Sequence, residues 1–393
     1  MLGRLGTEEA VSKNEMNRDR WVKIMDDKEN MNKCKTNKGK MNKGKTNTKT
    51  GLREDAMKKW RRWGCGLAAG VMLCLLGGCK TFSDSPEPVR KSGFLLNTYV
   101  AVTVYDKKKE HLVDEALNLC RDYERQLSRT LEGSEIYALN HREKGVNECE
   151  VSASTAELLK KGLDYSQISD GAFDITIEPL SSLWNFTSGE NVIPDAEKIN
   201  EAAKKVDFRQ VSVEGNRVIF HSEETTLELG AIAKGYIADQ MKTYLTDNGV
   251  KSGIIDLGGN ILCIGERPDK TPFKIGLQKP FADRSETIAV LNIQDQSVVT
   301  SGVYERHFIL DGVNYHHILN PKTGYPYDNG LISVTIVSDK SVDGDGLSTT
   351  CFSLGLEKGL ELVNSLDGVY GYFITSDDQV IYSEGAEELL LRE

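Results

Sequence analysis

The hydrophobic pattern of the chain changes period repeatedly from Gly93 onward. Apolar and polar residues alternate in "TYVAVTVYD" (98–106), which predicts a strand, and apolar residues three and four positions apart predict a helix over residues 110–130. A second helix is expected over residues 152–169, opened by a serine or threonine cap, and a hairpin is expected over residues 210–222.

The second half of the chain reads mainly as strands. A helical segment that contains Lys234 is followed by strand patterns, then by a helix that starts at Asp345 and by a closing hairpin over residues 369–383. Runs of strands with few helices predict an α+β fold rather than a doubly wound sheet, and the repeated βα units of solute-binding lipoproteins are lacking. The intervening strand patterns cover residues 253–265, 273–278, 287–294, 307–311 and 332–339.

The N-terminal part divides into three segments of different composition. Residues 1–56 are rich in Lys, Asn and Thr and lack apolar periodicity, which predicts a disordered or non-native extension. Residues 57–78 join basic residues to an apolar run, as in a signal peptide, and the run is shorter than the ~20 residues of a spanning helix. Residues 79–92 are expected to be a polar tether that leads into one domain at 93–393.

Cys79 directly follows the apolar run. The string "LGGC" resembles the lipobox of bacterial lipoproteins, in which the chain is cut before the cysteine and the thiol is lipidated. A lipid on Cys79 would tether the mature protein to the membrane on its extracytoplasmic face. The alternative is an ordinary signal peptide or membrane anchor.

Composition narrows the classes of partner. The chain of 393 residues is 39% hydrophobic and has a net charge of −10, with its basic residues concentrated before Cys79. The acidic remainder argues against a nucleic-acid partner. The later cysteines match no zinc or CxxC spacing; Cys120 and Cys351 are expected to be buried thiols, with a disulfide as the alternative.

The string "DGDGLSTTCF" (343–352) combines a carboxylate and a hydroxyl at helical spacing. Residues four apart share one face of a helix, so Asp345 and Thr349 would present oxygen atoms to one point. Such oxygens suit a hard cation such as Mg²⁺, which usually also takes phosphate oxygens from a substrate. The alternative is that Asp345 only caps the helix.

Three other segments place polar residues in apolar surroundings. Asp174 lies among large apolar residues and must be paired, hydrogen-bonded or functional. Glu228 and Lys234 flank a glycine-containing turn from a predicted strand to a helix, which suits an anion, although a solvated lysine is the alternative. His316 and His317 are adjacent, so at most one faces a given pocket; either a structural or a proton-accepting histidine fits.

Taken in order, these segments resemble the successive motifs of one family, the ApbE-type FAD:protein FMN transferases. The resemblance covers about residues 93–390. The matching strings are "SEIYALN", "GAFDITIEPLSSLW", "LELGAIAKGYIAD", "IDLGGNI", "TSGVYERHF", "YHHILNPKTGYP" and "DGDGLSTTCFSLG".

The resemblance implies a T-fold-like α+β protein of two similar halves with the flavin site between them. It also implies Mg²⁺-dependent cleavage of the FAD pyrophosphate, transfer of FMN to a threonine or serine of a partner protein such as an extracytoplasmic redox subunit, and release of AMP. By motif position, the metal ligands would be Asp345, Thr349 and the carbonyl of Ala231, the general base would be His317, and FAD contacts would come from Leu96, Thr130, Ala172, Phe173, Asp174, Glu228, Lys234 and Leu319.

Four positions depart from the family pattern. Leu96 and Asn97 replace the first two residues of a common Met-Gly-Thr, and Glu228 stands where Asp is usual. Thr130 stands where the family commonly has an aromatic residue that is associated with transfer of FMN rather than hydrolysis of FAD. The alternatives are therefore a Mg²⁺-dependent FAD pyrophosphatase that yields FMN and AMP, and a flavin-binding lipoprotein without turnover.

Overall fold

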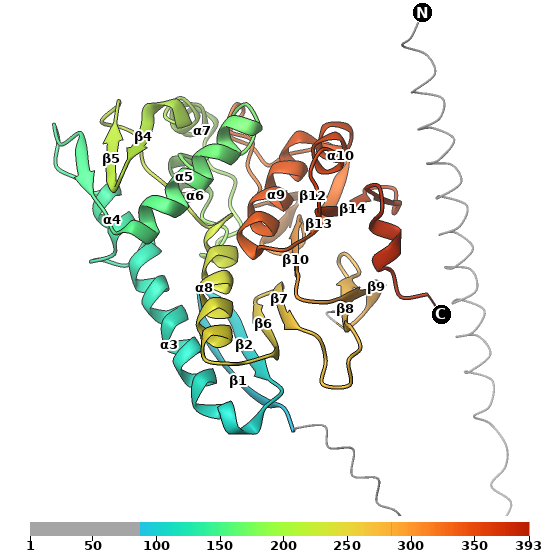
Figure 1. Ribbon diagram of the computed structural model, residues 1–393. Helices are drawn as coiled ribbons and strands as arrows, with labels where there is room; N and C mark the ends of the chain where they lie inside the picture. The colour runs from blue at the N-terminus through green and yellow to red at the C-terminus, as the bar shows by residue number, and fades with distance from the viewer. Residues whose placement is uncertain (1–86, 284, 393) are drawn as a thin grey trace, which may run out of the picture. The chain divides into compact units, whose positions relative to one another are not determined.

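The computed structural model describes residues 87–283 and 285–392, which form an α+β fold (Figure 1). Its helices are α3 Glu110–Leu127, α4 Glu135–Asn140, α5 Ala153–Ile168, α6 Glu178–Trp184, α7 Ala196–Ala203, α8 Ala233–Asp247, α9 Ser341–Leu354 and α10 Leu356–Asn364. Its strands are β1 Val89–Leu95, β2 Thr98–Val104, β3 Glu148–Glu150, β4 Val211–Glu214, β5 Arg217–Phe220, β6 Ser252–Leu257, β7 Asn260–Gly265, β8 Phe273–Gln278, β9 Thr287–Ile293, β10 Ser297–Gly302, β11 His307–Leu310, β12 Val313–His316, β13 Leu331–Ser338, β14 Tyr370–Thr375 and β15 Val380–Tyr382.

The main sheet consists of two four-stranded halves joined edge to edge. Its order is β1-β2-β6-β7-β10-β13-β14-β15, and neighbouring strands pair antiparallel, with β7 and β10 at the junction. Helices α3 and α8 pack against the first half, and α9 and α10 pack against the second. The α+β prediction is confirmed.

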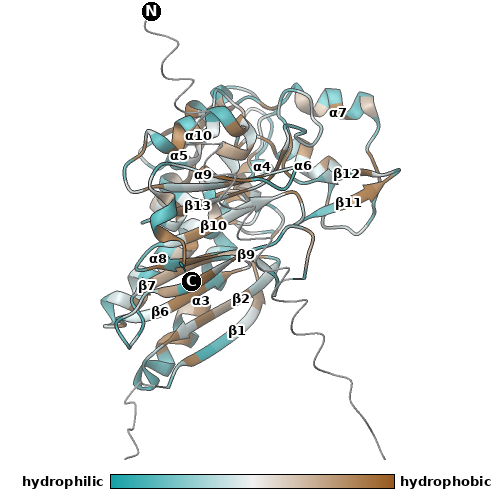
Figure 2. Ribbon diagram, turned by 90° about the vertical axis from the view of Figure 1, so that its right-hand side faces the viewer, coloured by the Kyte–Doolittle hydropathy of each residue, from teal (hydrophilic) through white to brown (hydrophobic). Residues whose placement is uncertain are grey.

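The core lies between these helices and the sheet. On β2 the residues Val100, Val102 and Val104 are fully buried and join one apolar cluster with Ile237 and Met241 of α8. The alternation predicted for residues 98–106 therefore identifies the strand correctly. Apolar residues of the small β11–β12 hairpin remain exposed at its tip, including Ile309 and Val313 (Figure 2).

The N-terminal predictions fall almost entirely outside the described residues. The expected extension 1–56, the signal peptide 57–78 and Cys79 all precede Glu87, where the description begins. Strand β1 starts at Val89, so the last residues of the expected tether 79–92 belong to the sheet. In the described part of the chain, no helix is both long enough and apolar enough to span a bilayer.

The cysteines within the described residues carry free thiols. Cys120, Cys263 and Cys351 are buried, and burial raises the pKa of each to about 12. Cys149 is only partly buried. The prediction of buried thiols at Cys120 and Cys351 is confirmed, and the alternative of a disulfide among these residues is not.

Helices α8 and α9 cross in direct contact and cap each other. The carboxylate of Asp239 in α8 accepts hydrogen bonds from the backbone N–H groups of Ser341 (2.8 Å) and Val342 (2.9 Å), which open α9. The carboxylate of Asp345 in α9 accepts from the N–H of Gly235 (2.9 Å) in the first turn of α8. Each helix therefore supplies an acceptor for the unpaired donors of the other.

This arrangement corrects the expected start of the last long helix. The helix begins at Ser341 rather than at Asp345, because Asp239 satisfies its first N–H groups from another element. The interpretation of Asp345 as the cap of its own helix is therefore wrong. Asp345 instead caps α8, which fixes its carboxylate at the junction of the two helices.

The crossing depends on the missing side chain of Gly235. A Cβ atom at this position would overlap the Ser341 carbonyl oxygen and carbon. We expect Gly235→Ala to lower the free energy of unfolding by about 1–3 kcal/mol, because overpacking forces backbone shifts. Urea denaturation measures this loss. Gly93→Ala is the control, since a Cβ at Gly93 meets nothing within 4 Å; equal stability of the two variants would contradict the close crossing.

Candidate active site at the crossing of two helices

The site is centred on the buried carboxylate of Asp345. Its side chain is 4% exposed, and Oδ1 accepts a hydrogen bond from the ammonium of Lys234 at 3.1 Å while Oδ2 accepts from Gly235. Lys234 lies in the first turn of α8, where the helix dipole also favours negative charge. A buried carboxylate requires such partners to remain ionised.

Two further oxygen atoms are available beside this carboxylate. The hydroxyl of Thr349 lies one turn further along α9, on the same face as Asp345. The Ala231 carbonyl lies just before α8, one turn ahead of Gly235, but the Gly235 N–H that would be its helical partner is used by Asp345. Within residues 87–283 and 285–392 no hydrogen bond reaches the Ala231 oxygen.

The carboxylate, the hydroxyl and the unpaired carbonyl form an oxygen donor set that fits a hard cation. Within the described residues there is no cluster of three or more His, Cys, Asp or Glu side chains that could hold a metal alone. An ion held by these three oxygens would complete its shell with water or with oxygens of a bound substrate. Mg²⁺ commonly completes its shell with water and substrate phosphate oxygens, so the donor set suits Mg²⁺ bound together with a phosphate compound.

Glu228 lies on an irregular segment before α8, not on the strand expected from the sequence. Its neighbour Leu227 pairs with the side-chain amide of Asn140 rather than with a strand: the Leu227 N–H donates to Oδ1 (2.7 Å), and Nδ2 donates to the Leu227 carbonyl (2.9 Å). Arg142 donates to the carbonyls of Ser222 (2.9 Å) and Thr225 (2.8 Å) in the same segment. Helix α4 therefore holds the segment that carries Glu228 and Ala231.

The two hydrogen bonds between Asn140 and Leu227, here called the Asn140 clamp, should stabilise the fold. We expect Asn140→Ala to lower the free energy of unfolding by about 1–3 kcal/mol, because the polar groups of Leu227 lose their partners in a part-buried site. The control is Asn118→Ala, since Asn118 is bonded only to Arg121 of its own helix among the described residues and a surface change costs within about 0.5 kcal/mol. A loss no greater than that of the control would show that the clamp contributes nothing.

Glu228 takes part in a network of charged groups. Arg129 forms an ion pair with Glu228 and also approaches Glu178 at 3.5 Å, while Thr226 donates to Glu178 at 2.8 Å. Burial raises the pKa of Glu228, and the nearby positive charge of Arg129 opposes that rise. Thr130 directly follows Arg129 and is exposed, and its hydroxyl pairs with Ser128 at 3.3 Å. The network therefore links the Thr130 loop to Glu228.

The two adjacent histidines have different surroundings. His316 is 3% exposed, with its Nε2 bonded to the Tyr327 carbonyl (2.9 Å) and its Nδ1 accepting from the N–H of Ile318 (3.3 Å). Burial lowers the pKa of His316 to about 4. These contacts make His316 a structural residue.

The Nδ1 atom of His317 is buried and has no hydrogen-bond partner among the described residues. Burial, aided by the positive charges of Arg306 and Lys234, lowers its pKa to about 3. The positive charge of Arg306 acts on both His317 and Glu228. His317 is therefore held in the neutral form, with its Nδ1 unpartnered among the described residues.

The expected FAD contacts at 172–174 lie on a tightly bonded turn. Asp174 accepts from the Thr176 N–H (2.8 Å) and hydroxyl (2.7 Å) and from the Phe208 N–H (2.9 Å). Burial raises its pKa, and these hydrogen bonds oppose the rise. The Ala172 carbonyl accepts from the Tyr327 hydroxyl (2.9 Å), and Phe173 is buried. Asp174 therefore meets the prediction that a carboxylate in such surroundings is hydrogen-bonded.

The remaining predicted contacts are not hydrogen-bonded to Asp345 in the described part of the chain. Leu96 has a positive φ of 53°, and its N–H donates to the Glu124 carboxylate at 2.7 Å. Leu319 is buried against Trp184 in a separate apolar cluster. Their roles as FAD contacts stay predictions.

Sequence reasoning missed several residues that organise the site. Arg129, Asn140, Arg306 and Ser301 all lie inside or beside the quoted motifs, but their partners are far away along the chain. The sequence feature that could have pointed to these residues is their position next to predicted contacts. Arg129, for example, directly precedes Thr130. Which partner each side chain meets depends on the packing of α4, α8 and α9.

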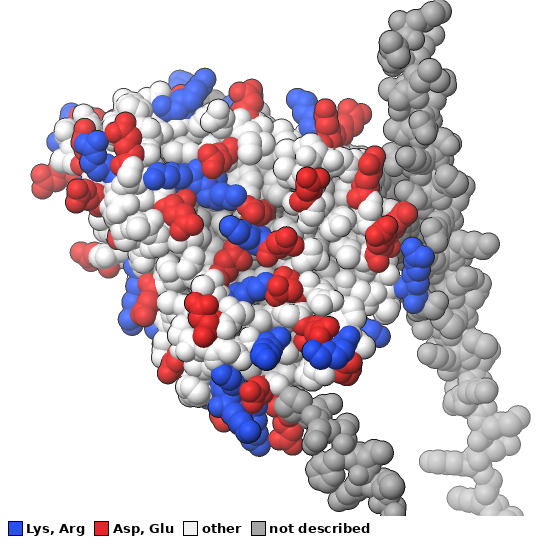
Figure 3. All heavy atoms as spheres, viewed as in Figure 1, with Lys and Arg blue, Asp and Glu red and all other residues white. Residues whose placement is uncertain are grey.

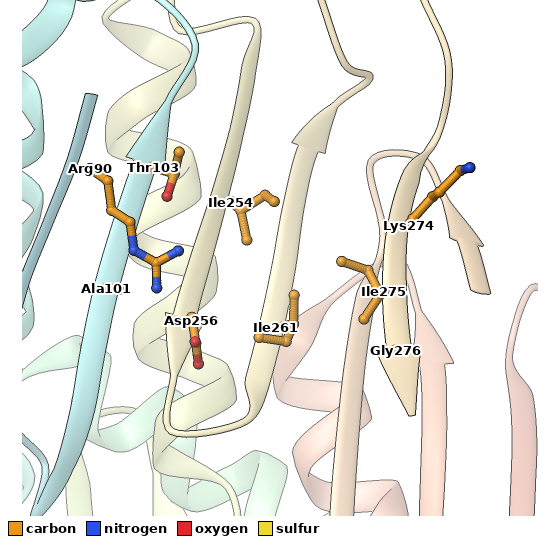
Figure 4. Close-up of a pocket in the computed structure, with 9 residues that line it drawn as sticks. All are labelled: Arg90, Ala101, Thr103, Ile254, Asp256, Ile261, Lys274, Ile275 and Gly276. Carbon is orange, nitrogen blue, oxygen red and sulfur yellow. The ribbon is translucent and has the colours of Figure 1, made fainter. Parts of the chain in front are cut away.

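The described part of the chain also has a pocket away from this site. It is lined by residues of β1, β2, β6, β7 and β8, has a volume of about 260 Å³, and includes Arg90, Asp256 and Lys274 (Figure 4). None of the predicted site residues lines it.

On the face seen in Figure 3, acidic and basic side chains are interspersed rather than segregated.

Comparison with known proteins identifies the family. The model of the ApbE family matches residues 96–373. A FAD:protein FMN transferase of Klebsiella pneumoniae is 36% identical over 74% of this chain and 90% of its own length, and one of Treponema pallidum is 34% identical over 80% and 93%.

Solved structures give the same result for the fold. The ApbE protein of Thermotoga maritima superposes with a TM-score of 0.71 at 29% identity, over 78% of this chain and 100% of that one. The flavin transferase ApbE from Vibrio cholerae gives 0.69 at 27% identity, over 77% and 99%. The chain therefore belongs to the ApbE family.

Proposed function

We propose that this protein is a FAD:protein FMN transferase that requires Mg²⁺. It cleaves the pyrophosphate of FAD, attaches FMN to a threonine or serine hydroxyl of an acceptor protein and releases AMP. The observation that carries the proposal is the buried Asp345 carboxylate at the start of α8, with the Thr349 hydroxyl on the same face of α9 and the Ala231 carbonyl, which is unpaired among the described residues, just before α8. The names of the related proteins support the substrate and the group transferred.

The residues of the site can hold a diphosphate and a cation together. Asp345, Thr349 and Ala231 would ligate Mg²⁺, and Lys234 supplies positive charge next to them. Mg²⁺, when bound, neutralises the diphosphate and stabilises the departing AMP phosphate. Glu228, which is paired with Arg129, lies on the segment that carries Ala231 and would contact FAD from that side.

His317 would accept the proton of the incoming hydroxyl. The acceptor oxygen forms a bond to the phosphorus of the FMN half while the bond from that phosphorus to the bridging oxygen breaks, and AMP leaves with that oxygen. A neutral imidazole is the form that can take a proton, and His317 is neutral because of burial and nearby cations. The diphosphate brings negative charge close to His317 and so raises its pKa toward the working pH.

Hydrolysis of FAD is the competing outcome of the same site. Thr130 is exposed and bonded only to Ser128 among the described residues, so it offers no aromatic surface that would cover the reacting phosphate from water. Water in place of the acceptor hydroxyl would yield FMN and AMP. The balance between transfer and hydrolysis depends on how well an acceptor excludes that water.

The proposed location is the extracytoplasmic face of the cell membrane. Cys79 and the signal-peptide pattern before it would place a lipid a few residues ahead of β1. The acceptor would then be another extracytoplasmic protein, such as a redox or electron-transport subunit.

One incubation separates the candidate functions. The protein is mixed with FAD, Mg²⁺ and an acceptor polypeptide containing threonine, and the products are analysed by mass spectrometry. A covalent FMN adduct on the acceptor with release of AMP is the expected result. Free FMN and AMP without an adduct would support the pyrophosphatase, and unchanged FAD would support a binding protein and contradict the proposal.

A further inference from the structure

A chain of three hydroxyl groups connects the sheet to the proposed metal ligand. Ser301 on β10 places its Oγ 2.9 Å from the Thr349 Oγ1 and 2.8 Å from the Ser348 Oγ. Ser348 in turn lies 3.0 Å from the carbonyl oxygen of Asp345. Ser348 is fully buried, so its hydroxyl has no access to water.

The end of this chain fixes the direction of its protons. The Asp345 carbonyl can only accept, so Ser348 donates to it and is left to accept from Ser301. Ser301 has then used its proton and accepts from Thr349. In the reverse order the Thr349 proton would find no acceptor, since Ser301 is the only hydrogen-bond partner of that hydroxyl among the described residues.

The direction decides what Thr349 presents to the site. Its proton points to Ser301, so its lone pairs are free to face a cation held by Asp345 on the same face of α9. A hydroxyl must present a lone pair to a cation, because a proton in that direction would be repelled. Partners behind the ligands of a metal commonly orient them in this way.

We propose that Ser301 is a positioning residue that turns the Thr349 hydroxyl toward the metal. This inference rests on the proposed function, because it requires a cation at Asp345 and Thr349. In this role Ser301 acts through its hydrogen bond to Thr349 rather than by binding the cation itself. Ser348 accepts the proton of Ser301 and so fixes its direction. The three hydroxyl groups of Ser348, Ser301 and Thr349 are called the hydroxyl relay below.

The test measures binding of Mn²⁺ alone, followed by loss of the electron paramagnetic resonance signal of the free ion. Ser301→Ala is expected to weaken Mn²⁺ binding by about 10- to 100-fold, because the Thr349 proton loses its acceptor. Ser348→Ala breaks the relay at its other link and is expected to weaken binding in the same direction. It provides the test if Ser301→Ala fails to fold.

Ser297→Ala is the matched control. Ser297 lies on the same strand, and its buried hydroxyl is hydrogen-bonded to Ser338 (3.0 Å) rather than to Thr349. Its affinity for Mn²⁺ should equal that of the wild type. FAD binding without metal, measured by flavin fluorescence in EDTA, should be unchanged in both Ser301→Ala and Ser297→Ala.

The outcomes separate this inference from the proposed function. Suppose that the wild type binds Mn²⁺ and that the folded Ser301 and Ser348 variants bind it equally well. This result would contradict the proposed role of the hydroxyl relay and would leave the proposed metal site unaffected. If Ser297→Ala loses as much affinity as Ser301→Ala, a general loosening of the strand explains the effect and the relay is also overturned. A wild type that binds no Mn²⁺ contradicts the metal site itself.

Discussion

Asp345→Asn is expected to lower the rate of FMN transfer at least about 10³-fold, because the substitution removes the only carboxylate among the three proposed metal ligands. A loss of about 4 kcal/mol in transition-state stabilisation corresponds to that factor. The variant should remain folded, since an amide oxygen can still accept from the Gly235 N–H. Transfer is followed by mass spectrometry at saturating FAD and Mg²⁺, and folding by circular dichroism.

Asp343→Asn removes the same charge from the same helix and serves as the control. Asp343 is partly exposed and is bonded to Tyr165 (2.7 Å) and Lys161 (2.6 Å), away from Lys234 and Gly235. Its transfer rate should stay close to that of the wild type. Full activity in Asp345→Asn with Mg²⁺ as the only metal would remove Asp345 from the mechanism.

His317→Gln is expected to lower the transfer rate by about 10²-fold or more, the usual effect of losing a general base. Glutamine keeps a polar side chain of similar size but cannot take up a proton. The effect should fall on the rate at saturating FAD rather than on FAD binding. His316→Asn is the comparison: it should reduce thermal stability, because His316 is buried and bonded on both nitrogens. Unchanged transfer in His317→Gln would contradict its role as base.

The protonation of His317 provides a second test of its role, through the pH dependence of stability and the effect of a diphosphate on its pKa. Burial and nearby cations lower its pKa to about 3 in the free protein, so the imidazole is neutral at every pH above that value. Protonation of a histidine in the unfolded chain, with a pKa near 6.5, therefore favours unfolding as the pH falls below about 6.5. Binding of a diphosphate should raise the pKa, and titration of the His317 resonance by NMR with and without ADP measures that change.

Local sequence patterns predicted the elements whose residues interact with near neighbours. Helix α5 begins after the cap Ser152, and the hairpin β4–β5 turns at Gly215 as the pattern indicates. Strand β1 was missed because its exposed residues leave little alternation to detect; it is held by pairing to β2. The start of α9 was misplaced because its cap, Asp239, comes from another helix.

The same distinction applies to the site. Asp345 and Thr349 could be paired from their spacing on one helix, which needs no knowledge of the fold. The unpaired Ala231 carbonyl could not be found in that way, because it results from the Gly235 N–H bonding to Asp345 across the helix crossing. The prediction of a strand at Glu228 is wrong for a related reason. The side chain of Asn140 forms the hydrogen bonds that a neighbouring strand would otherwise form.

The proposed mechanism requires a hard cation held between α8, α9 and a diphosphate. Crystals grown with Mn²⁺ and ADP, which carries the adenosine diphosphate part of FAD but no FMN to transfer, test this directly by anomalous diffraction. We predict a single strong peak about 2.1 Å from an Asp345 carboxylate oxygen, the Thr349 hydroxyl and the Ala231 carbonyl, in contact with the ADP phosphates. ADP bound with its Mn²⁺ peak remote from Asp345 and Thr349 would contradict the account.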